Sequence, residues 1–314
     1  MQEMNLLVTG GLGFIGSHFI RHAIDHVDAI INLDSITYAA NKDNLTDIAT
    51  NTKYHFVQMD VNDPAIGDVI NHHAITEVIH FAAESHVDRS IHNPDIFITS
   101  NINGTHNLLK AVRASKSVRR LLYVSTDEVY GSIDKGFSPE TAMLKPSSPY
   151  SASKAAGEML VMAYHRTYGL HTIITRSSNN YGSHQYPEKL IPVVIRSIKR
   201  AKRIPVYGKG VNVRDWMHVS DNVRGLWVAL CHGPAGSVYN ISSMKPCANI
   251  DLIYGLCDLI DPINRQLVHF VKDREGHDTR YAPDSSKIRS QLGWCPLQSM
   301  ASGLPGVIKW YMAR

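Results

Sequence analysis

Residues 4–16 read MNLLVTGGLGFIG, and this stretch decides the fold. Its apolar half predicts a strand, and glycines at 10, 13 and 16 predict a tight turn into a helix that begins near Phe14. Such glycines let a backbone approach a pyrophosphate at the amide end of a helix. Asp34 closes a second predicted strand, 18 positions after Gly16, the spacing of a carboxylate that binds an adenosine ribose. That carboxylate would repel a 2′-phosphate, so the pattern favours NAD over NADP; the plainer alternative is a glycine turn with a surface aspartate.

A second stretch carries reactive side chains. Thr126, Asp127 and Glu128 follow an apolar run, at the carboxyl end of a predicted strand, where open α/β sheets bind ligands. Tyr150 and Lys154 are four apart, so on a helix they share one face. A lysine ammonium beside a phenol favours the phenolate, so we expect Lys154 to lower the pKa of Tyr150 and make it a usable base. A base, a threonine hydroxyl and two neighbouring carboxyl groups are more than one hydride transfer needs. They indicate an enzyme that removes a hydride and also eliminates a leaving group.

The whole chain limits the class of protein. It has 314 residues, 44% of them hydrophobic, and a net charge of +4, which is too mild for a nucleic-acid binder. No apolar run approaches the about 20 residues of a membrane span, and the first predicted strand leaves no room for a signal peptide. The four cysteines lack C-x-x-C spacing, and we expect no carboxylate or thiol ligands to cluster with the best histidine run (18, 22 and 26). We therefore expect a reduced, cytoplasmic protein without a metal site.

Strands and helices alternate through the first 178 residues. Besides the elements above, strands are predicted at 54–58, 77–81, 121–124 and 171–176, and helices at 95–115 and 150–168. This order predicts a Rossmann-type, doubly wound parallel sheet over 1–178, rejoined by segments near 219–235. Residues 179–314 would form mainly a smaller α/β lobe. Its loops, with Lys189, Arg214 and Arg280, suit a polar, phosphate-bearing substrate, although solvated surface loops are an equal alternative.

The chain resembles the extended short-chain dehydrogenase/reductases and, within them, the dTDP-glucose 4,6-dehydratases. The likeness runs from Thr9 to Trp294 and is most specific at residues 82–90, 125–131, 178–182, 276–278 and 280–281. The Thr-Asp-Glu trio discriminates best, because the epimerase relatives lack the acidic pair there. The resemblance implies a Rossmann-type domain, tightly bound and recycled NAD, a nucleotide-sugar substrate in deoxysugar biosynthesis, and a homodimer formed through helices of the large domain.

The resemblance also implies a role for each reactive residue. Tyr150, helped by Lys154, takes the proton from the glucose C4 hydroxyl while the C4 hydride passes to NAD, and Thr126 hydrogen-bonds the C4 oxygen. Glu128 removes the C5 proton, and Asp127, as an acid, protonates the departing C6 hydroxyl. The hydride then returns to C6, which leaves a 4-keto-6-deoxy sugar.

Further contacts are implied for the two ligands. Those with the cofactor are Gly10, Gly11, Gly13, Phe14, Ile15, Gly16, Asp34, Ser35, Thr37, Tyr38, Asp60, Val61, Phe81, Ala82, Ala83, Ser85, Ser100, Tyr150, Lys154 and Asn180. Those with the nucleotide sugar are Ser85, Thr126, Asn179, Lys189, Leu190, Pro205, Tyr207, Arg214, Asn249, Asp273, His277 and Tyr281. Glu275 stands where the family has proline, so the loop around it is expected to differ.

Three alternatives stay open at this point. A UDP-glucose 4,6-dehydratase would use the same residues, because thymidine and uridine differ by one methyl group, which discriminates by only about 1–3 kcal/mol. A nucleotide-sugar 4-epimerase or decarboxylase would leave Asp127 and Glu128 unexplained. A non-catalytic NAD-binding protein would be expected to have lost reactive residues, and all five are present.

Overall fold

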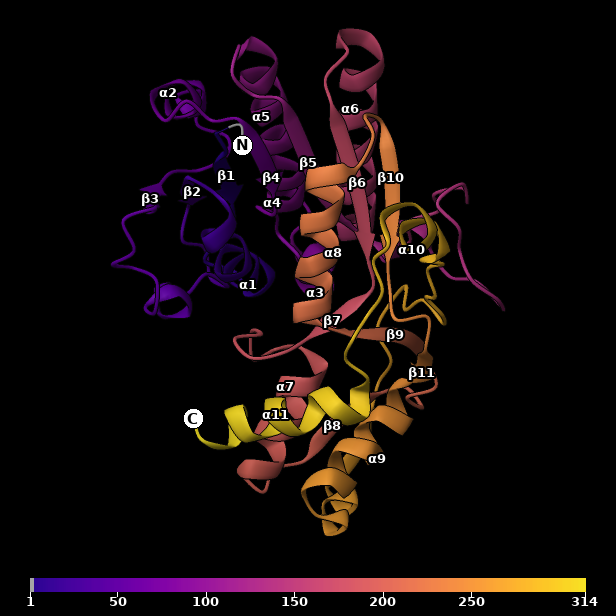
Figure 1. The fold of residues 1–314 in the computed structure, drawn as a ribbon. Coiled ribbons are helices and arrows are strands. Elements are labelled where there is room, and N and C mark those ends of the chain that lie inside the picture. The colour runs from indigo at the N-terminus through magenta and orange to yellow at the C-terminus, as the bar shows by residue number, and fades with distance from the viewer. Residues whose placement is uncertain (1–2) are drawn as a thin grey trace.

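The computed structural model describes residues 3–314, and its largest unit is a seven-stranded sheet (Figure 1). The strands follow the order β10-β6-β5-β4-β1-β2-β3, and every pair is parallel. They are β1 (Asn5–Thr9), β2 (Ala29–Asp34), β3 (Tyr54–Gln58), β4 (Glu77–His80), β5 (Arg120–Thr126), β6 (Thr172–Ser177) and β10 (Ser237–Ile241). The predicted Rossmann-type fold class is confirmed, and each strand predicted in the first 178 residues is present.

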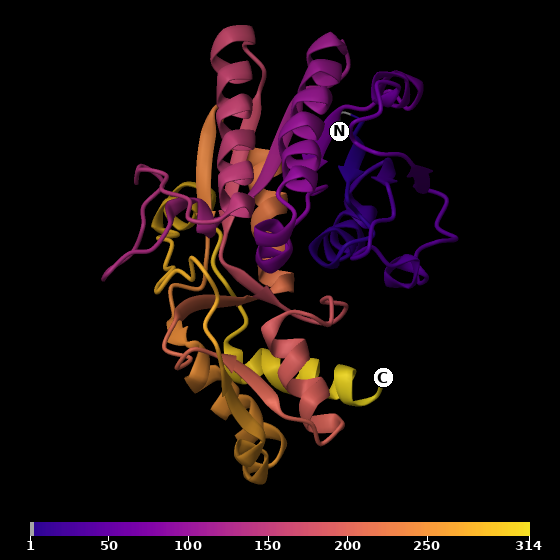
Figure 2. The same ribbon diagram turned by 180° about the vertical axis from the view of Figure 1, so that it is seen from behind.

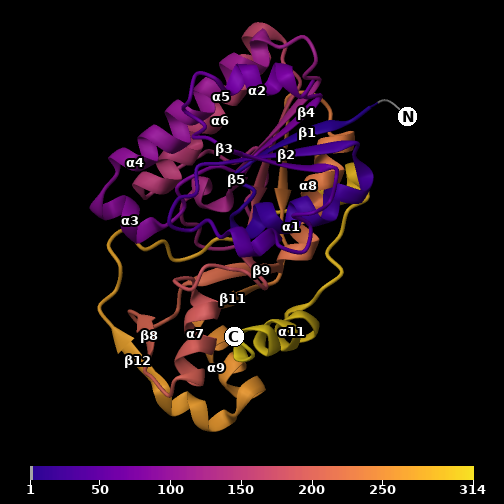
Figure 3. The ribbon, with the colours of Figure 1, turned by 90° about the vertical axis from the view of Figure 1, so that its left-hand side faces the viewer.

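Helices cover both faces of this sheet (Figure 3). On one face α1 (Phe14–Ala23) packs against α8 (Val219–His232), and their apolar sides share a core with β1 and β6. The other face carries α2 (Ile66–His72), α5 (Gly104–Ala114) and α6 (Pro149–Tyr168). Because both faces are covered, the central strands β1, β2 and β5 supply apolar side chains to the cores on both sides, as parallel strands generally do.

The helix predicted over 95–115 is present but is interrupted. After α3 (Val87–His92), the short α4 (Asp95–Phe97) runs into a π-helical turn, Ile98–Asn103, before α5 begins. Asn101 in this turn is buried and bonds Ser153 of α6 (Nδ2–Oγ 2.8 Å) as well as the backbone of Glu84. The wide turn therefore aims an amide at the segments that border the site, a placement typical of π-bulges.

A smaller lobe follows β6 and has its own core (Figure 2). Its strands are β7 (Asn179–Tyr181), β9 (Val213–His218) and β11 (Pro246–Ala248) in one sheet, and β8 (Ile204–Tyr207) with β12 (Val268–Val271) in another. Its helices are α7 (Leu190–Lys199), α9 (Asn249–Ile260) and α11 (Met300–Met312). The chain returns to the large sheet through α8 and β10, so the rejoining segment continues to Ile241, and α10 (Ser286–Leu292) packs beside it.

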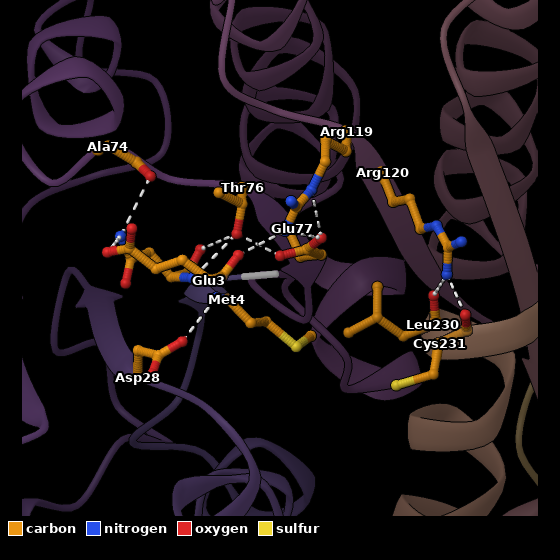
Figure 4. A network of polar contacts seen from close by, with 11 residues as sticks. Glu3, Met4, Asp28, Ala74, Thr76, Glu77, Arg119, Arg120, Leu230 and Cys231 are labelled. Atoms are coloured by element: carbon orange, nitrogen blue, oxygen red, sulfur yellow. Dashed lines mark hydrogen bonds and ion pairs between the residues drawn. The ribbon is translucent and has the colours of Figure 1, made fainter. Parts of the chain in front are cut away.

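A network of hydrogen bonds and ion pairs lies at the amino ends of the strands of the large sheet (Figure 4). The Arg119 guanidinium pairs with Glu77 at 2.8 Å, and the backbone amide of Met4 donates to Asp28 at 2.8 Å. Arg120 donates to the carbonyl oxygens of Leu230 and Cys231 at the end of α8. The charged groups of this end are thus paired within the chain.

Three plain observations concern other classes of function. Within residues 3–314 no helix has both the length and the apolar character needed to cross a membrane. Over the same residues, no group of three or more histidine, cysteine, aspartate or glutamate side chains is arranged to hold a metal ion. The four cysteines are free thiols, at positions 231, 247, 257 and 295.

Candidate active site

The carboxyl ends of the strands open into a cavity of about 560 Å³ between the sheet and the small lobe. Its walls come from the turn after β1, the ends of β2, β4, β5 and β6, the start of α6, and the segment 177–189. This is the edge where open parallel sheets bind ligands. The volume falls within the range of small-molecule sites, which is about 300–1,000 Å³.

The turn after β1 is shaped for close backbone approach. Gly10 has φ +74°, and a Cβ there would lie 2.7 Å from the backbone nitrogen of Ala82. A Cβ on Gly16 would lie 2.4 Å from the carbonyl oxygen of Gly10. Gly13 caps α1 without a side-chain hydrogen bond, so the first amides of the helix keep their donors for a ligand. Side chains at positions 10 and 16 would therefore disrupt the cradle.

Asp34 ends β2 at the floor of the cavity. Its carboxylate accepts hydrogen bonds from the backbone amides of Leu12 (3.0 Å) and Ile36 (2.8 Å). Burial raises the pKa of Asp34, and these two hydrogen bonds oppose the rise. The carboxylate is thus fixed beside the glycine turn, where a ribose hydroxyl would donate to it.

Most residues predicted to contact the cofactor line this cavity. They are Gly10, Gly13, Phe14, Ile15, Gly16, Asp34, Ser35, Thr37, Asp60, Val61, Phe81, Ala82, Ala83, Ser85, Ser100, Tyr150, Lys154 and Asn180. Gly11 and Tyr38 lie outside this lining, and their contacts with the cofactor stay a prediction. A Cβ on Gly11 would collide with Asn32, so glycine serves packing there. The Tyr38 hydroxyl donates to Glu188 at 3.2 Å, and its ring is covered by the Arg89 guanidinium.

The Thr-Asp-Glu trio occupies the end of β5. Thr126 is the last strand residue, and Asp127 and Glu128 begin a 3₁₀ turn that ends at Tyr130. The Thr126 hydroxyl caps this turn by accepting from the Glu128 amide at 3.3 Å. The cap turns both carboxyl side chains toward the cavity, whose wall they form together with Tyr150.

The two carboxyl groups have different surroundings. Asp127 is 3% exposed, and its Oδ2 has no hydrogen-bond partner within residues 3–314. Burial, and then the neighbouring charge of Glu128, raise the pKa of Asp127 well above its usual range. Burial also raises the pKa of Glu128, but the cations of Arg214 and Lys189 oppose that rise. Both pKa values are therefore raised, that of Asp127 the more strongly, so Asp127 has the stronger tendency to hold a proton.

Helix α6 presents Tyr150 and Lys154 to the cavity. Ser148 and Ser151 form a reciprocal capping box, and Pro149 takes the first helical position, so the start of the helix is well defined. The Lys154 ammonium donates to the carbonyl oxygen of Val124 at 2.7 Å. Burial lowers the pKa of Lys154 to about 7. Both side chains are buried, at 8% and 3% exposure.

The expected direction of the Tyr150 shift is wrong. Burial, and then the negative charge of Glu128, raise the pKa of Tyr150 well above its ordinary value, while a hydrogen bond with Thr126 opposes the rise. The sequence argument counted only the lysine charge. In the structure the Lys154 amine bonds a backbone carbonyl of β5, and desolvation of the phenol outweighs any help from it.

The residues predicted to bind the substrate divide into two groups. Ser85, Thr126, Asn179 and Lys189 line the cavity, and the Lys189 ammonium donates to the Ser85 carbonyl at 3.2 Å, joining the lobes. The others lie outside its lining, and they are Leu190, Pro205, Tyr207, Arg214, Asn249, Asp273, His277 and Tyr281.

Within that outer group, side chains still meet one another. The Arg214 guanidinium lies 4.2 Å from the Tyr281 ring centre, and Arg214 also donates to the Asp278 carbonyl. His277 hydrogen-bonds Asp273 at 2.7 Å, and its ring faces Tyr207. Arg274, in the same loop, pairs with Asp88 of α3 at 2.5 Å, so this loop bridges the lobes even though Glu275 stands in place of a proline.

Sequence reasoning missed several polar residues of the wall. Buried hydroxyl groups on Ser125 and Ser178 have no hydrogen-bond partner in the part of the chain that is described. Ser125 precedes Thr126 at the end of β5, and Ser178 precedes Asn179 just after β6. Their position next to predicted site residues is the sequence signal that could have identified them. Gln185, Tyr186 and Glu188 also line the cavity, but their loop carries no comparable pattern.

Comparisons with known proteins agree on one family. A family model described as GDP-mannose 4,6 dehydratase matches residues 7–305. The dTDP-glucose 4,6-dehydratase of Neisseria meningitidis is 46% identical over 98% of this chain and 93% of its own length. The dTDP-glucose 4,6-dehydratase 1 of Escherichia coli K12 is 44% identical, with 99% and 93% covered.

Solved structures extend this likeness to three dimensions. DesIV, a dTDP-glucose 4,6-dehydratase from Streptomyces venezuelae with NAD and TYD bound, matches with a TM-score of 0.96 at 43% identity, covering 99% of this chain and 98% of its own. A UDP-glucose 4-epimerase from Thermotoga maritima with UDP-glucose matches with a TM-score of 0.91, but at 28% identity over 99% of each chain.

Proposed function

The chain belongs to the GDP-mannose 4,6 dehydratase family, and we propose that it converts dTDP-glucose to dTDP-4-keto-6-deoxyglucose with loss of water. Its curated relatives at about the same level of identity carry the name dTDP-glucose 4,6-dehydratase over nearly their whole length. The enzyme is a hydro-lyase, its cofactor is NAD, and its substrate is a nucleotide sugar.

The residues present fit the dinucleotide. The glycine cradle at positions 10 and 16 has no room for a side chain, and Asp34 lies beside it as an acceptor. The hydroxyl of Ser178 and the side-chain oxygen of Asn180 are buried without partners in residues 3–314, so they remain available to a ligand. When bound there, NAD supplies a hydride acceptor and then a hydride donor.

Oxidation at C4 is assigned to the residues that share the wall with the cofactor. Tyr150 takes the proton of the C4 hydroxyl, and Thr126 hydrogen-bonds the C4 oxygen. The raised pKa of Tyr150 makes its phenolate a strong base once formed, and Lys154, one turn further along α6, is assigned to support it. The buried setting excludes bulk water during hydride transfer.

Elimination is assigned to the neighbouring carboxyl groups. A ketone at C4 acidifies C5, so a positioned carboxylate such as Glu128 suffices to remove the C5 proton. Hydroxide is a poor leaving group, and Asp127, protonated in its buried place, donates the proton that makes C6 oxygen leave as water. The pKa of Asp127 is raised well above its usual range, whereas Lys189 and Arg274 act against the rise at Glu128, and such a difference suits an acid and base pair.

The observation that carries the proposal is this pair of carboxyl groups in one cavity with Thr126 and Tyr150. An epimerase needs only the proton and hydride transfers at C4 and would leave a buried, unpartnered carboxyl group without purpose.

The test is incubation of the purified protein with dTDP-glucose and, separately, with UDP-glucose, without added cofactor. Mass spectrometry should find the loss of one water from dTDP-glucose. Loss from UDP-glucose alone would contradict the thymidine base. An unchanged mass with both substrates would contradict the dehydratase assignment.

A homodimer through the helices of the large domain is part of the same proposal. Ile98, Met159 and Tyr168 lie on the helical segments of the large domain and are 45%, 47% and 44% exposed, and a partner subunit would cover such apolar side chains. Light scattering after size exclusion should give twice the mass of the 35.0 kDa chain. A monomer at micromolar concentration would contradict the homodimer. The cytoplasmic location stays a prediction.

A further inference from the structure

A second cavity, of about 540 Å³, lies between the two lobes and shares Ala39, Ala40, Gln185 and Tyr186 with the dehydratase cavity. Its other walls come from residues 39–44, from α7 and from the last turns of α11. None of the residues assigned to substrate or catalysis lines it. Its size suits a small organic ligand rather than a single ion.

Cations dominate its wall. Arg196, Lys199 and Arg200 project from α7, and Arg314 follows α11, whereas Asp43 is the one carboxylate among the described lining residues. None of these four side chains makes an ion pair or a hydrogen bond within residues 3–314, and the Arg314 guanidinium stacks on the Trp310 ring, 4.1 Å from its centre. Three of them lie at i, i+3 and i+4 on one helix face, where like charges lower helix stability. Such an arrangement is stabilised when an anion binds.

Aromatic rings supply the rest of the wall. The His184 ring lies 4.9 Å from that of Trp310, and Tyr186 and Tyr311 complete the aromatic lining. His184 has φ +64°, a left-handed conformation that is costly for a residue other than glycine. His184 lines the second cavity and its neighbour Gln185 lines both, so this strained loop borders the two cavities.

One polar atom in the shared loop also lacks a partner. The side-chain oxygen of Gln185 is buried and unbonded within the described chain, while its amide nitrogen donates to the Asn180 carbonyl at 2.9 Å. The Gln185 carbonyl accepts from Tyr311 of α11 at 2.7 Å. The loop is therefore hydrogen-bonded to the cofactor wall on one side and to α11 on the other.

We propose that this cavity is a second ligand site, which takes a nucleoside polyphosphate with its phosphates on the α7 cations and its base against the aromatic wall. The phosphates replace missing counter-ions, and the base accounts for a volume that inorganic phosphate would not fill. Occupancy reaches the dehydratase cavity through Gln185 and Asn180.

The experiment is calorimetric titration of the NAD-loaded protein with ATP and, separately, with inorganic pyrophosphate. The double variant Lys199→Glu/Arg200→Glu should weaken ATP binding by about tenfold to a hundredfold, since two charge-assisted contacts are lost. The matched control is Lys202→Glu/Arg203→Glu, which changes two exposed cations just beyond α7 that do not line the cavity, and it should bind ATP within about twofold of the unchanged protein.

A third variant separates base from phosphate. Trp310→Ala should weaken ATP binding and leave pyrophosphate binding unchanged, with circular dichroism used to check folding. Equal weakening in the two charge variants would show general surface attraction and overturn the site. Equal affinity for ATP and pyrophosphate, or an absence of binding heat with both, would overturn the assignment to a nucleotide.

Discussion

The two ends of the large sheet treat buried polar groups in opposite ways. At the amino ends, Glu77 is paired with Arg119, and Arg120 is held by carbonyl groups of α8. At the carboxyl ends, Asp127 Oδ2 and the Ser125 hydroxyl are buried without partners in residues 3–314. The same seven strands thus have one end whose charges are satisfied and one end whose groups are left for a ligand.

The difference shows where stability is exchanged for chemistry. A buried polar group without a hydrogen-bond partner lowers the free energy of unfolding by about 1–3 kcal/mol. Such groups therefore need a reason other than stability. Paired groups at the amino end stabilise the strands, whereas unpaired groups at the other end have displaced pKa values that suit acid and base roles. Substitutions at the two ends should therefore have different signatures.

The largest effect is expected for Tyr150→Phe at the carboxyl end. Without the phenol, no group takes the C4 proton, so reduction of bound cofactor by dTDP-glucose should slow by about 10²–10⁴-fold. Stopped-flow absorbance of the reduced cofactor measures this step. Tyr168→Phe, an exposed residue on the same helix, is the control and should react at the normal rate. Fast reduction in the Tyr150 variant would remove it from the first step.

Glu128→Gln should separate the two halves of the reaction. The first hydride transfer needs Tyr150 and not Glu128, so absorbance of the reduced cofactor should appear and then persist, while water loss falls by about 10²–10⁴-fold. Rapid-quench mass spectrometry measures the dehydrated product beside the absorbance. Normal turnover in this variant would sink the assignment of Glu128 as the C5 base.

Glu77→Gln tests the opposite end. The variant loses the ion pair with Arg119, and the free energy of unfolding should fall by about 1–3 kcal/mol. Turnover should stay normal, because Glu77 lies at the far end of its strand from the cavity. Urea unfolding and a dTDP-glucose assay give the two readings. A loss of turnover without a loss of stability would erase the contrast between the ends.

The smallest effect on stability is expected for Asp127→Asn, which should sharpen the contrast between the two ends of the sheet. The folded state raises the pKa of Asp127, so between its ordinary pKa and the raised one the native protein holds a proton that the unfolded chain has lost. The contribution of Asp127 to the free energy of unfolding is therefore fully present below its ordinary pKa, and it is lost as the pH rises from there through the raised pKa of the folded state.

The amide cannot ionise, so Asp127→Asn should be more stable than the unchanged protein, by about 1 kcal/mol near neutral pH, and less so in acid. Urea unfolding across pH measures the difference, and water elimination should be slow at every pH. A variant that is less stable at neutral pH would contradict the raised pKa.

Much of the fold was predictable because its signals are local. Gly10, Gly16 and Asp34 mark the nucleotide turn by spacing alone, and the apolar runs locate the strands. The π-helical turn around Asn101 was not predictable, since its reason is a hydrogen bond to Ser153, far along the chain. Long-range packing decides such details.

The sequence predicts which residues line the site better than it predicts their pKa shifts. The trio at 126–128 and the pair on α6 do share one cavity. The direction of the Tyr150 shift depends on burial, which no spacing reports, and Lys154 has a backbone partner that the motif does not show. The packing of Gly11 against Asn32 and the hydrogen bond of Tyr38 to Glu188 are likewise long-range contacts that the motif does not report.

The most direct test of the central claim is the protonation state of Asp127 itself. Infrared difference spectra at neutral pH, comparing the unchanged protein with Asp127→Asn and Glu128→Gln, can detect the carbonyl stretch of a protonated carboxyl group. The account predicts that this band is present, that it disappears in Asp127→Asn, and that it survives in Glu128→Gln. A band that is absent, or that disappears only in Glu128→Gln, would contradict the assignment of acid and base.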